Sequence, residues 1–254
     1  VTTNGRTSKS IYNANNKTVT STSAAGRQSV SFFDDKGRVI QEQVPGLANV
    51  YYSYDSRGRL TVVSEGDGGQ ARTTVISYSP NSGYVAKITD ALQRSEEYTR
   101  DAVGRILVQK LPDHRQIQYS YDQNGNVTAI TPPSRPVHGF EYTAVDLQQQ
   151  YTPPVLNNVS QPQTQYVYNL DKQLVQIQRP DGQVIDLLYD PVNGHLNRLD
   201  LPGSEAVNYA YSGSTGQLET ITAADGSTLS YAYDGSLPLS ETWGNGSITG
   251  TLTL

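Results

Sequence analysis

The stretch Tyr52-Ser53-Tyr54-Asp55-Ser56-Arg57-Gly58-Arg59-Leu60 decides the fold, because the chain repeats it. The stretch Tyr119-Ser120-Tyr121-Asp122-Gln123-Asn124-Gly125-Asn126-Val127 follows the same pattern, Tyr-x-Tyr-Asp-x-x-Gly-[Arg/Asn]-[Leu/Val]. Side chains alternate along a strand, so Tyr-x-Tyr places two rings on one face. An Asp that binds backbone amides and a Gly that supplies a positive φ then form a turn. The pattern predicts a β-hairpin.

Further copies of the pattern keep its register with fewer of its residues. The stretches Phe33–Val39 and Arg100–Ile106 keep the Asp and the Gly, and Tyr166–Leu174 has Lys172 in place of the glycine. The copies recur at about 21 residues, a spacing typical of repeat architectures. Turn signals such as Pro180-Asp181-Gly182 fall between them. The chain therefore reads as consecutive hairpins.

The repeat positions that we expect to shape this fold are the tyrosines, aspartates and glycines of the copies. They are Tyr52, Tyr54, Asp55, Gly58, Asp101, Gly104, Tyr119, Tyr121, Asp122, Gly125, Tyr166, Tyr168, Tyr189, Asp190, Gly194, Tyr209, Tyr211, Gly216, Tyr231, Tyr233 and Asp234.

Two finer expectations concern the strands. Leu60 and Val63 open a second strand three residues apart, which breaks two-residue alternation. This spacing favours a β-bulge in each second strand, although partial cover of both faces would also explain it. Tyrosine rings of neighbouring hairpins are expected to form a ladder of cross-strand aromatic pairs.

The composition agrees with a thin sheet. The 254 residues are 35% hydrophobic and 17% charged, with 18 Tyr and a net charge of -5. Disordered chains are poor in aromatic residues and highly charged, so the sequence is not typical of disorder. About ten hairpins laid flat would be on the order of 100 Å wide, which open sheets do not sustain. We expect an all-β fold in which residues 1–254 form one long curved sheet, with an irregular element around 132–163.

Several classes of protein are excluded by what the sequence lacks. With 0 Cys there are no disulfides, thiolate metal sites or cysteine nucleophiles. His114, His138 and His195 lie far apart, so we expect no metal and no cofactor. No apolar run is long enough for a transmembrane helix, and we expect no signal peptide at the start of the chain. With 0 Met, the chain reads as a piece of a longer protein. Scattered charges of acidic balance argue against a nucleic-acid partner.

The Tyr-Asp-x-x-Gly-Arg-Leu unit closely resembles the YD repeat of Rhs proteins, of the B and C components of insecticidal toxin complexes, and of teneurins. The resemblance covers nearly the whole chain, with degenerate copies of the repeat at Tyr12-Asn13 and Ala25-Gly26-Arg27. It implies a section of a hollow spiral shell that encapsulates a C-terminal toxin or cargo polypeptide in a secreted or cell-surface protein. The partners would be the rest of the shell and that cargo. The family's self-cleaving core is not visible, since Asp190-Pro191 lacks its context.

The residues offer less support for other functions. The alternative is an adhesion module that binds a glycan or a partner protein through exposed tyrosines. Catalysis has no support, because a turn role explains each recurring Asp and no Gly-x-Ser-x-Gly motif occurs. Gly66-Asp67-Gly68-Gly69 reads as a hairpin tip, and His138 as a structural hydrogen-bonding residue. Open sheet edges are expected to allow self-association.

Overall fold

The computed structural model describes residues 2–3, 6–155, 163–245 and 248–253. These residues form β-strands and a short 3-10 helix, Gly68–Gln70, so the expected all-β class is confirmed. None of the described residues belongs to a helix long and apolar enough to cross a membrane. The chain divides into two compact units, residues 1–119 with 132–134, and residues 120–131 with 135–254.

In the first unit, β1 and β2 pair with each other, and from β3 onward each strand pairs antiparallel with the next one in the chain. The strands are β1 (Thr2–Thr3), β2 (Arg6–Thr7), β3 (Lys9–Asn13), β4 (Thr18–Thr22), β5 (Gln28–Phe33), β6 (Val39–Gln43), β7 (Val50–Tyr54), β8 (Leu60–Glu65), β9 (Arg72–Tyr78), β10 (Val85–Thr89), β11 (Ser95–Arg100), β12 (Ile106–Lys110) and β13 (Gln116–Tyr121), whose last two residues fall in the second unit.

The second unit has the same order of antiparallel neighbours. Its strands are β14 (Val127–Thr131), β15 (His138–Tyr142), β16 (Gln148–Thr152), β17 (Thr164–Tyr168), β18 (Leu174–Gln178), β19 (Val184–Tyr189), β20 (Leu196–Leu201), β21 (Glu205–Tyr211), β22 (Leu218–Thr222), β23 (Thr228–Asp234), β24 (Leu237–Asn245) and β25 (Ile248–Thr253).

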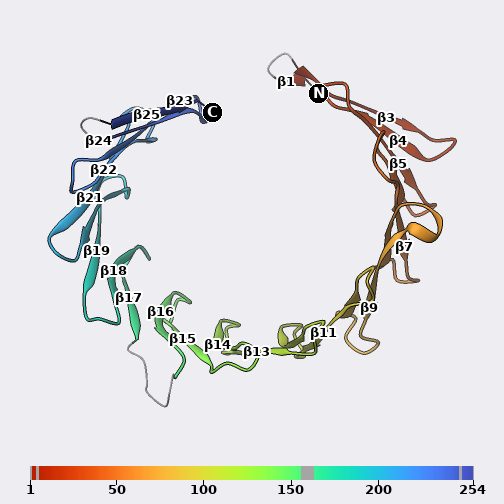
Figure 1. The fold of residues 1–254 in the computed structure, drawn as a ribbon, viewed down its shortest axis with the longest axis horizontal. Coiled ribbons are helices and arrows are strands. Elements are labelled where there is room, and N and C mark those ends of the chain that lie inside the picture. Colours follow the sequence, from red (N-terminus) through yellow and green to blue (C-terminus); the bar gives the residue numbers. More distant parts are fainter. Residues whose placement is uncertain (1, 4–5, 156–162, 246–247, 254) are drawn as a thin grey trace. The chain divides into compact units, whose positions relative to one another are not determined.

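Within each unit the strands follow one another in a single curved layer (Figure 1). A second layer does not cover either face in the described parts of the chain, and no apolar side chain there is fully buried. Among the described polar residues, Thr18 is buried, with 5% of its surface exposed. Stability therefore depends on half-buried side chains and backbone pairing, as the thin-sheet interpretation expects.

The predicted bulge in the second strand is confirmed for most of the repeats, although the β3–β4 hairpin pairs without one. Tyr54 pairs with Leu60 and Ser53 pairs with Val62, so Thr61 is the extra residue. The same shift occurs beside Phe33, Arg100, Tyr142, Tyr168, Tyr189, Tyr211 and Tyr233. The extra residue brings Leu60 and Val63 to the face that carries Tyr52 and Tyr54. We call this face, in every repeat, the Tyr face.

The segment expected to be irregular is only partly described. Strands β15 and β16 pair in the usual antiparallel way and carry the usual bulge, so residues 138–152 are more regular than the sequence suggested. Residues 156–162, the other part of that expectation, lie outside the described residues.

Candidate functional site

The turns of the repeats are held by the aspartate that the sequence singled out. Asp55 accepts the backbone N–H groups of Arg57 and Arg59 at 2.9 Å, and its second oxygen accepts Nε of Arg59 at 2.8 Å. Gly58 has a φ of 83°, as predicted. The backbone N–H of Arg59 holds the pKa of the Asp55 carboxyl below its usual value.

Other turns build the same arrangement from different residues. Asp101 accepts N–H groups of Val103 and Arg105, and the Asp122 carboxylate accepts both the backbone and the side-chain amide of Asn126. In the copy without glycine, Lys172 takes a φ of 64°. In the longer turn at Asp190, the carboxylate accepts the backbone N–H groups of Val192 and Asn193 instead. Positive φ is therefore required by the turn even where glycine is absent.

Successive repeats are joined by the tyrosine just before the turn, which is the second tyrosine where the repeat has Tyr-x-Tyr. The Tyr54 hydroxyl donates to the carbonyl of Val39 at 2.7 Å, which belongs to the preceding repeat. The acceptor directly follows the last turn residue, Arg38, of that repeat. The same bond joins Tyr78 to Leu60, Tyr142 to Val127, Tyr168 to Gln148, Tyr189 to Leu174, Tyr211 to Leu196 and Tyr233 to Leu218, at 2.7 to 3.0 Å.

The expected ladder of tyrosine rings is wrong for these residues. Strands that carry Tyr-x-Tyr alternate with strands that carry Leu-x-x-Val, so the residue opposite Tyr54 is Leu60 and not a ring. Tyrosines of neighbouring repeats are two strands apart, too far for direct pairing. The tyrosine hydroxyl, rather than the ring face, makes the contact between repeats.

In three of these junctions a turn side chain covers the tyrosine ring. The guanidinium of Arg38 lies 4.6 Å from the ring centre of Tyr54, and Arg59 lies 4.1 Å from that of Tyr78. At the same turn position, the His195 ring packs on Tyr211 at 4.4 Å. We call the tyrosine, its carbonyl acceptor and this covering side chain the repeat clamp. The covering residue was not predicted, although the recurring [Arg/Asn] directly after the turn glycine could have indicated it.

One clamp in the first unit has its residues exchanged. Arg100 stands where other repeats have the second tyrosine, and its Nε donates to the Val85 carbonyl at 3.1 Å. Tyr84 stands at the turn position and donates to the carbonyl of Val103 at 3.3 Å. Its ring lies against Gly104, where an added Cβ would come within 2.5 Å of it. The junction keeps its hydrogen bond to the backbone despite the exchange.

The first tyrosine of each pair has a different environment. Tyr52 donates to Glu42 at 2.9 Å, and Tyr119 donates to Gln109 at 3.4 Å. Tyr209 lies on the same face as Tyr211 and opposite Ile221, away from the carbonyl of the clamp. The two tyrosines of the motif are therefore not equivalent.

The Tyr face of the second unit is apolar from β17 to β23. Along β19 to β21 it presents Ile185, Leu187, Leu199 and Val207, which follow from the strand registers. The opposite face of the same strands is more polar, with Asp186, Arg198, Asp200 and Asn208. All the apolar residues named here are half-buried, and no described element covers them.

The remaining candidates make no convergent site. His138 is bonded to the Tyr151 hydroxyl at 2.7 Å, so its hydrogen-bonding role is confirmed. In the hairpin tip, Asp67 accepts the hydroxyl of Tyr51 at 2.5 Å. The described residues contain no group of three His, Asp or Glu side chains able to hold a metal ion.

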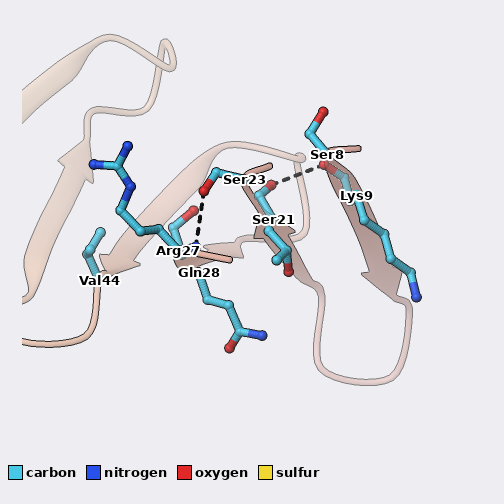
Figure 2. Close-up of a pocket in the computed structure, with 10 residues that line it drawn as sticks. Ser8, Lys9, Ser21, Ser23, Arg27, Gln28 and Val44 are labelled. Atoms are coloured by element: carbon cyan, nitrogen blue, oxygen red, sulfur yellow. Dashed lines mark hydrogen bonds between the residues drawn. The ribbon is translucent and has the colours of Figure 1, made fainter. Parts of the chain in front are cut away.

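A shallow groove of about 350 Å³ lies on β3 to β5 of the first unit, and half of the residues that line it are serines. Ser10 and Ser21 hydrogen-bond to each other at 3.1 Å. The two cationic side chains that line the groove, Lys9 and Arg27, extend away from each other (Figure 2). The groove therefore presents no gathered charge to a ligand.

The clamp bond can be tested within one strand. Tyr211→Phe removes the hydroxyl that donates to Leu196, and we expect about 1 kcal/mol lower stability because a carbonyl loses its partner. Tyr209→Phe, two residues away on the same face, is the control and should change stability much less. Urea unfolding followed by circular dichroism measures both. Equal losses would contradict a special role for the second tyrosine.

Comparison with known proteins agrees with this geometry. Crystal structures of TcdB2-TccC3-Cdc42 and of TcdB2-TccC3 superpose with TM-scores of 0.61 and 0.59, each at 16% identity over 92% of this chain and 16% of theirs. The tRNA nuclease WapA of Bacillus subtilis is 29% identical over 75 residues, which is 30% of this chain and 3% of WapA. This chain thus spans a small part of each relative. The sequence model of the teneurin YD-shell matches residues 3–252. The chain belongs to the teneurin YD-shell family.

Proposed function

We propose that this chain is a segment of the wall of a YD-repeat shell, and that the shell encloses a toxin or other cargo polypeptide in a secreted or surface-exposed protein. The segment has a structural role and no catalytic one. The observation that carries the proposal is the apolar Tyr face of the second unit, which no described element covers.

An uncovered apolar face of this kind favours the binding of another polypeptide. Apolar area exposed to water is unfavourable, and monomeric soluble proteins rarely leave large continuous patches of it uncovered. A single-layer wall can bind an extended polypeptide along such a face. Apolar contact is non-directional, so the wall needs no pocket shaped for particular side chains. The repeat clamps support this role by stiffening the layer through bonds to its own backbone.

The absence of cysteine makes the contact testable. Val207→Cys and Asn208→Cys place a thiol on the Tyr face and on the opposite face of the same strand. Each variant is incubated with an unfolded model polypeptide that carries one cysteine, under mild oxidation. We expect the disulfide cross-link to form at least several times faster at Val207. Equal rates, or faster cross-linking at Asn208, would contradict the proposal.

The adhesion alternative stays a prediction, as does association through sheet edges. The second tyrosines that it would offer to a glycan already donate their hydroxyls to the wall's own carbonyls. Enclosure therefore accounts for more of the Tyr face than glycan binding does.

A further inference from the structure

We propose that the Tyr face binds basic side chains of the enclosed polypeptide at three carboxylate–tyrosine pairs. The inference rests on the proposed function and names the kind of polypeptide segment that the wall favours. The pairs are Glu42 with Tyr52, Glu96 with Tyr98, and Glu241 with Tyr231, the first two in the first unit and the third in the second unit.

Each pair places a carboxylate beside a phenol ring on the same face. Glu42 accepts the Tyr52 hydroxyl at 2.9 Å, and Glu96 accepts the Tyr98 hydroxyl at 2.7 Å. Glu96 also accepts Nε2 of Gln109 at 3.2 Å. All these side chains are half-buried, so a part of each carboxylate and ring still faces solvent.

The third pair comes from the register of the last strands. Glu241 lies directly opposite Tyr231, and Tyr231 is next to Tyr233 on the same face, with ring centres 6.4 Å apart. The nearby carboxylate contributes, after burial, to a raised pKa of Tyr231. The third pair therefore also places a carboxylate next to a tyrosine on the Tyr face, with a different strand supplying the acid.

These carboxylates differ from Glu97 and Asp200 on the opposite face. Glu97, the neighbour of Glu96 in the sequence, points the other way and lies 3.5 Å from both Lys87 and Lys110. Asp200 on the opposite face is paired with Arg198. In the described part of the chain, no lysine or arginine lies within ion-pair distance of Glu42, Glu96 or Glu241. These three carboxylates on the Tyr face are therefore left without a cationic partner.

One cation does lie on this face near a pair. The guanidinium of Arg100 is 5.4 Å from the ring centre of Tyr98. Its Nε and Nη1 donate to the backbone carbonyls of Val85 and Gly104, which fix its position in the exchanged clamp. It is thus held by the backbone carbonyls of the clamp and not by Glu96.

The chemistry of the pairs selects a cation with a hydrocarbon stem. An ammonium or guanidinium group is attracted both by a carboxylate and by the face of an aromatic ring. The stem of a lysine or arginine can lie on the neighbouring apolar side chains while its charged end reaches the pair. A segment rich in Asp or Glu would be repelled by the same carboxylates, and the whole chain carries a net charge of -5.

The test compares three labelled, extended peptides that share their apolar residues and carry Lys, Ser or Glu at the remaining positions. Their binding to the full chain is measured by fluorescence anisotropy at low and high salt. We expect the Lys peptide to bind most tightly and to weaken with salt. The combined variant Glu42→Gln, Glu96→Gln and Glu241→Gln should weaken its binding about tenfold, since each exposed charge pair contributes modestly. Glu97→Gln, the control on the opposite face, should change it less than about twofold.

The outcomes separate this inference from the proposed function. If the Ser peptide binds and the Lys peptide binds no better, the carboxylate–tyrosine pairs are overturned while an apolar enclosing face stands. If Glu97→Gln weakens binding as much as the combined variant, the site is not on the Tyr face and the inference fails. If none of the peptides binds, both the inference and the proposed function are overturned.

Discussion

Gly104→Ala is expected to destabilise the first unit by about 2 kcal/mol. Gly104 has a φ of 94°, which an alanine adopts only with strain. An added Cβ would also come within 2.5 Å of the Tyr84 ring, so the ring would have to leave its place. Tyr84 is 41% exposed and can swing into solvent, but it then loses its bond to Val103 and its packing on the turn.

The matched control for this substitution is Gly182→Ala in the second unit. Gly182 also has a positive φ, 79°, but an added Cβ there would meet nothing within 4 Å. It should therefore show only the strain, about 1 kcal/mol. Urea unfolding of both variants, with hydrogen exchange to locate the change, makes the comparison. Equal losses would show that the contact of Tyr84 with Gly104 contributes nothing.

The turns and the bulges could be predicted from the sequence because their causes are local. Asp55, Gly58 and Arg59 interact within five residues of chain, so their chemistry is visible in the motif itself. The spacing of Leu60 and Val63 showed the bulge in the same way. A thin layer without a buried apolar core also followed from composition, because few large apolar residues are available.

The contacts between repeats could not be predicted in the same way, because they join residues about fifteen positions apart whose meeting depends on how hairpins align. The ladder of rings was expected from Tyr-x-Tyr alone and ignored the Leu-x-x-Val strands that lie between. The carboxylates of the Tyr face were hidden for a similar reason. Glu96 and Glu97 must point to opposite faces, but only the strand register shows that Glu97 is the one that lies opposite Lys87 and Lys110.

Alkaline pH is expected to unfold the sheet between about pH 10 and pH 12. Burial raises the pKa of Tyr98 to about 12, and the hydrogen bond to Glu96 adds to this effect. Burial likewise raises the pKa of Tyr142, Tyr168 and Tyr211, whose hydroxyls donate to backbone carbonyls. A group with a higher pKa in the folded state stabilises the fold below its unfolded pKa, near 10, and this stabilisation is lost as the pH rises through the folded value. Once ionised, these phenols cannot donate, and negative charge would lie against carbonyl oxygens.

The measurement follows phenolate absorbance and far-ultraviolet circular dichroism on the same samples as the pH is raised. We expect the ionisation of Tyr142, Tyr168 and Tyr211 and the loss of β-structure to occur together, because their hydroxyl bonds join successive repeats. Tyr211→Phe has already lost one such bond, so it should start from lower stability and lose less of it as the pH rises. If all tyrosines ionise while the β-sheet signal stays unchanged, backbone pairing alone holds the wall together and the clamps do not stiffen it.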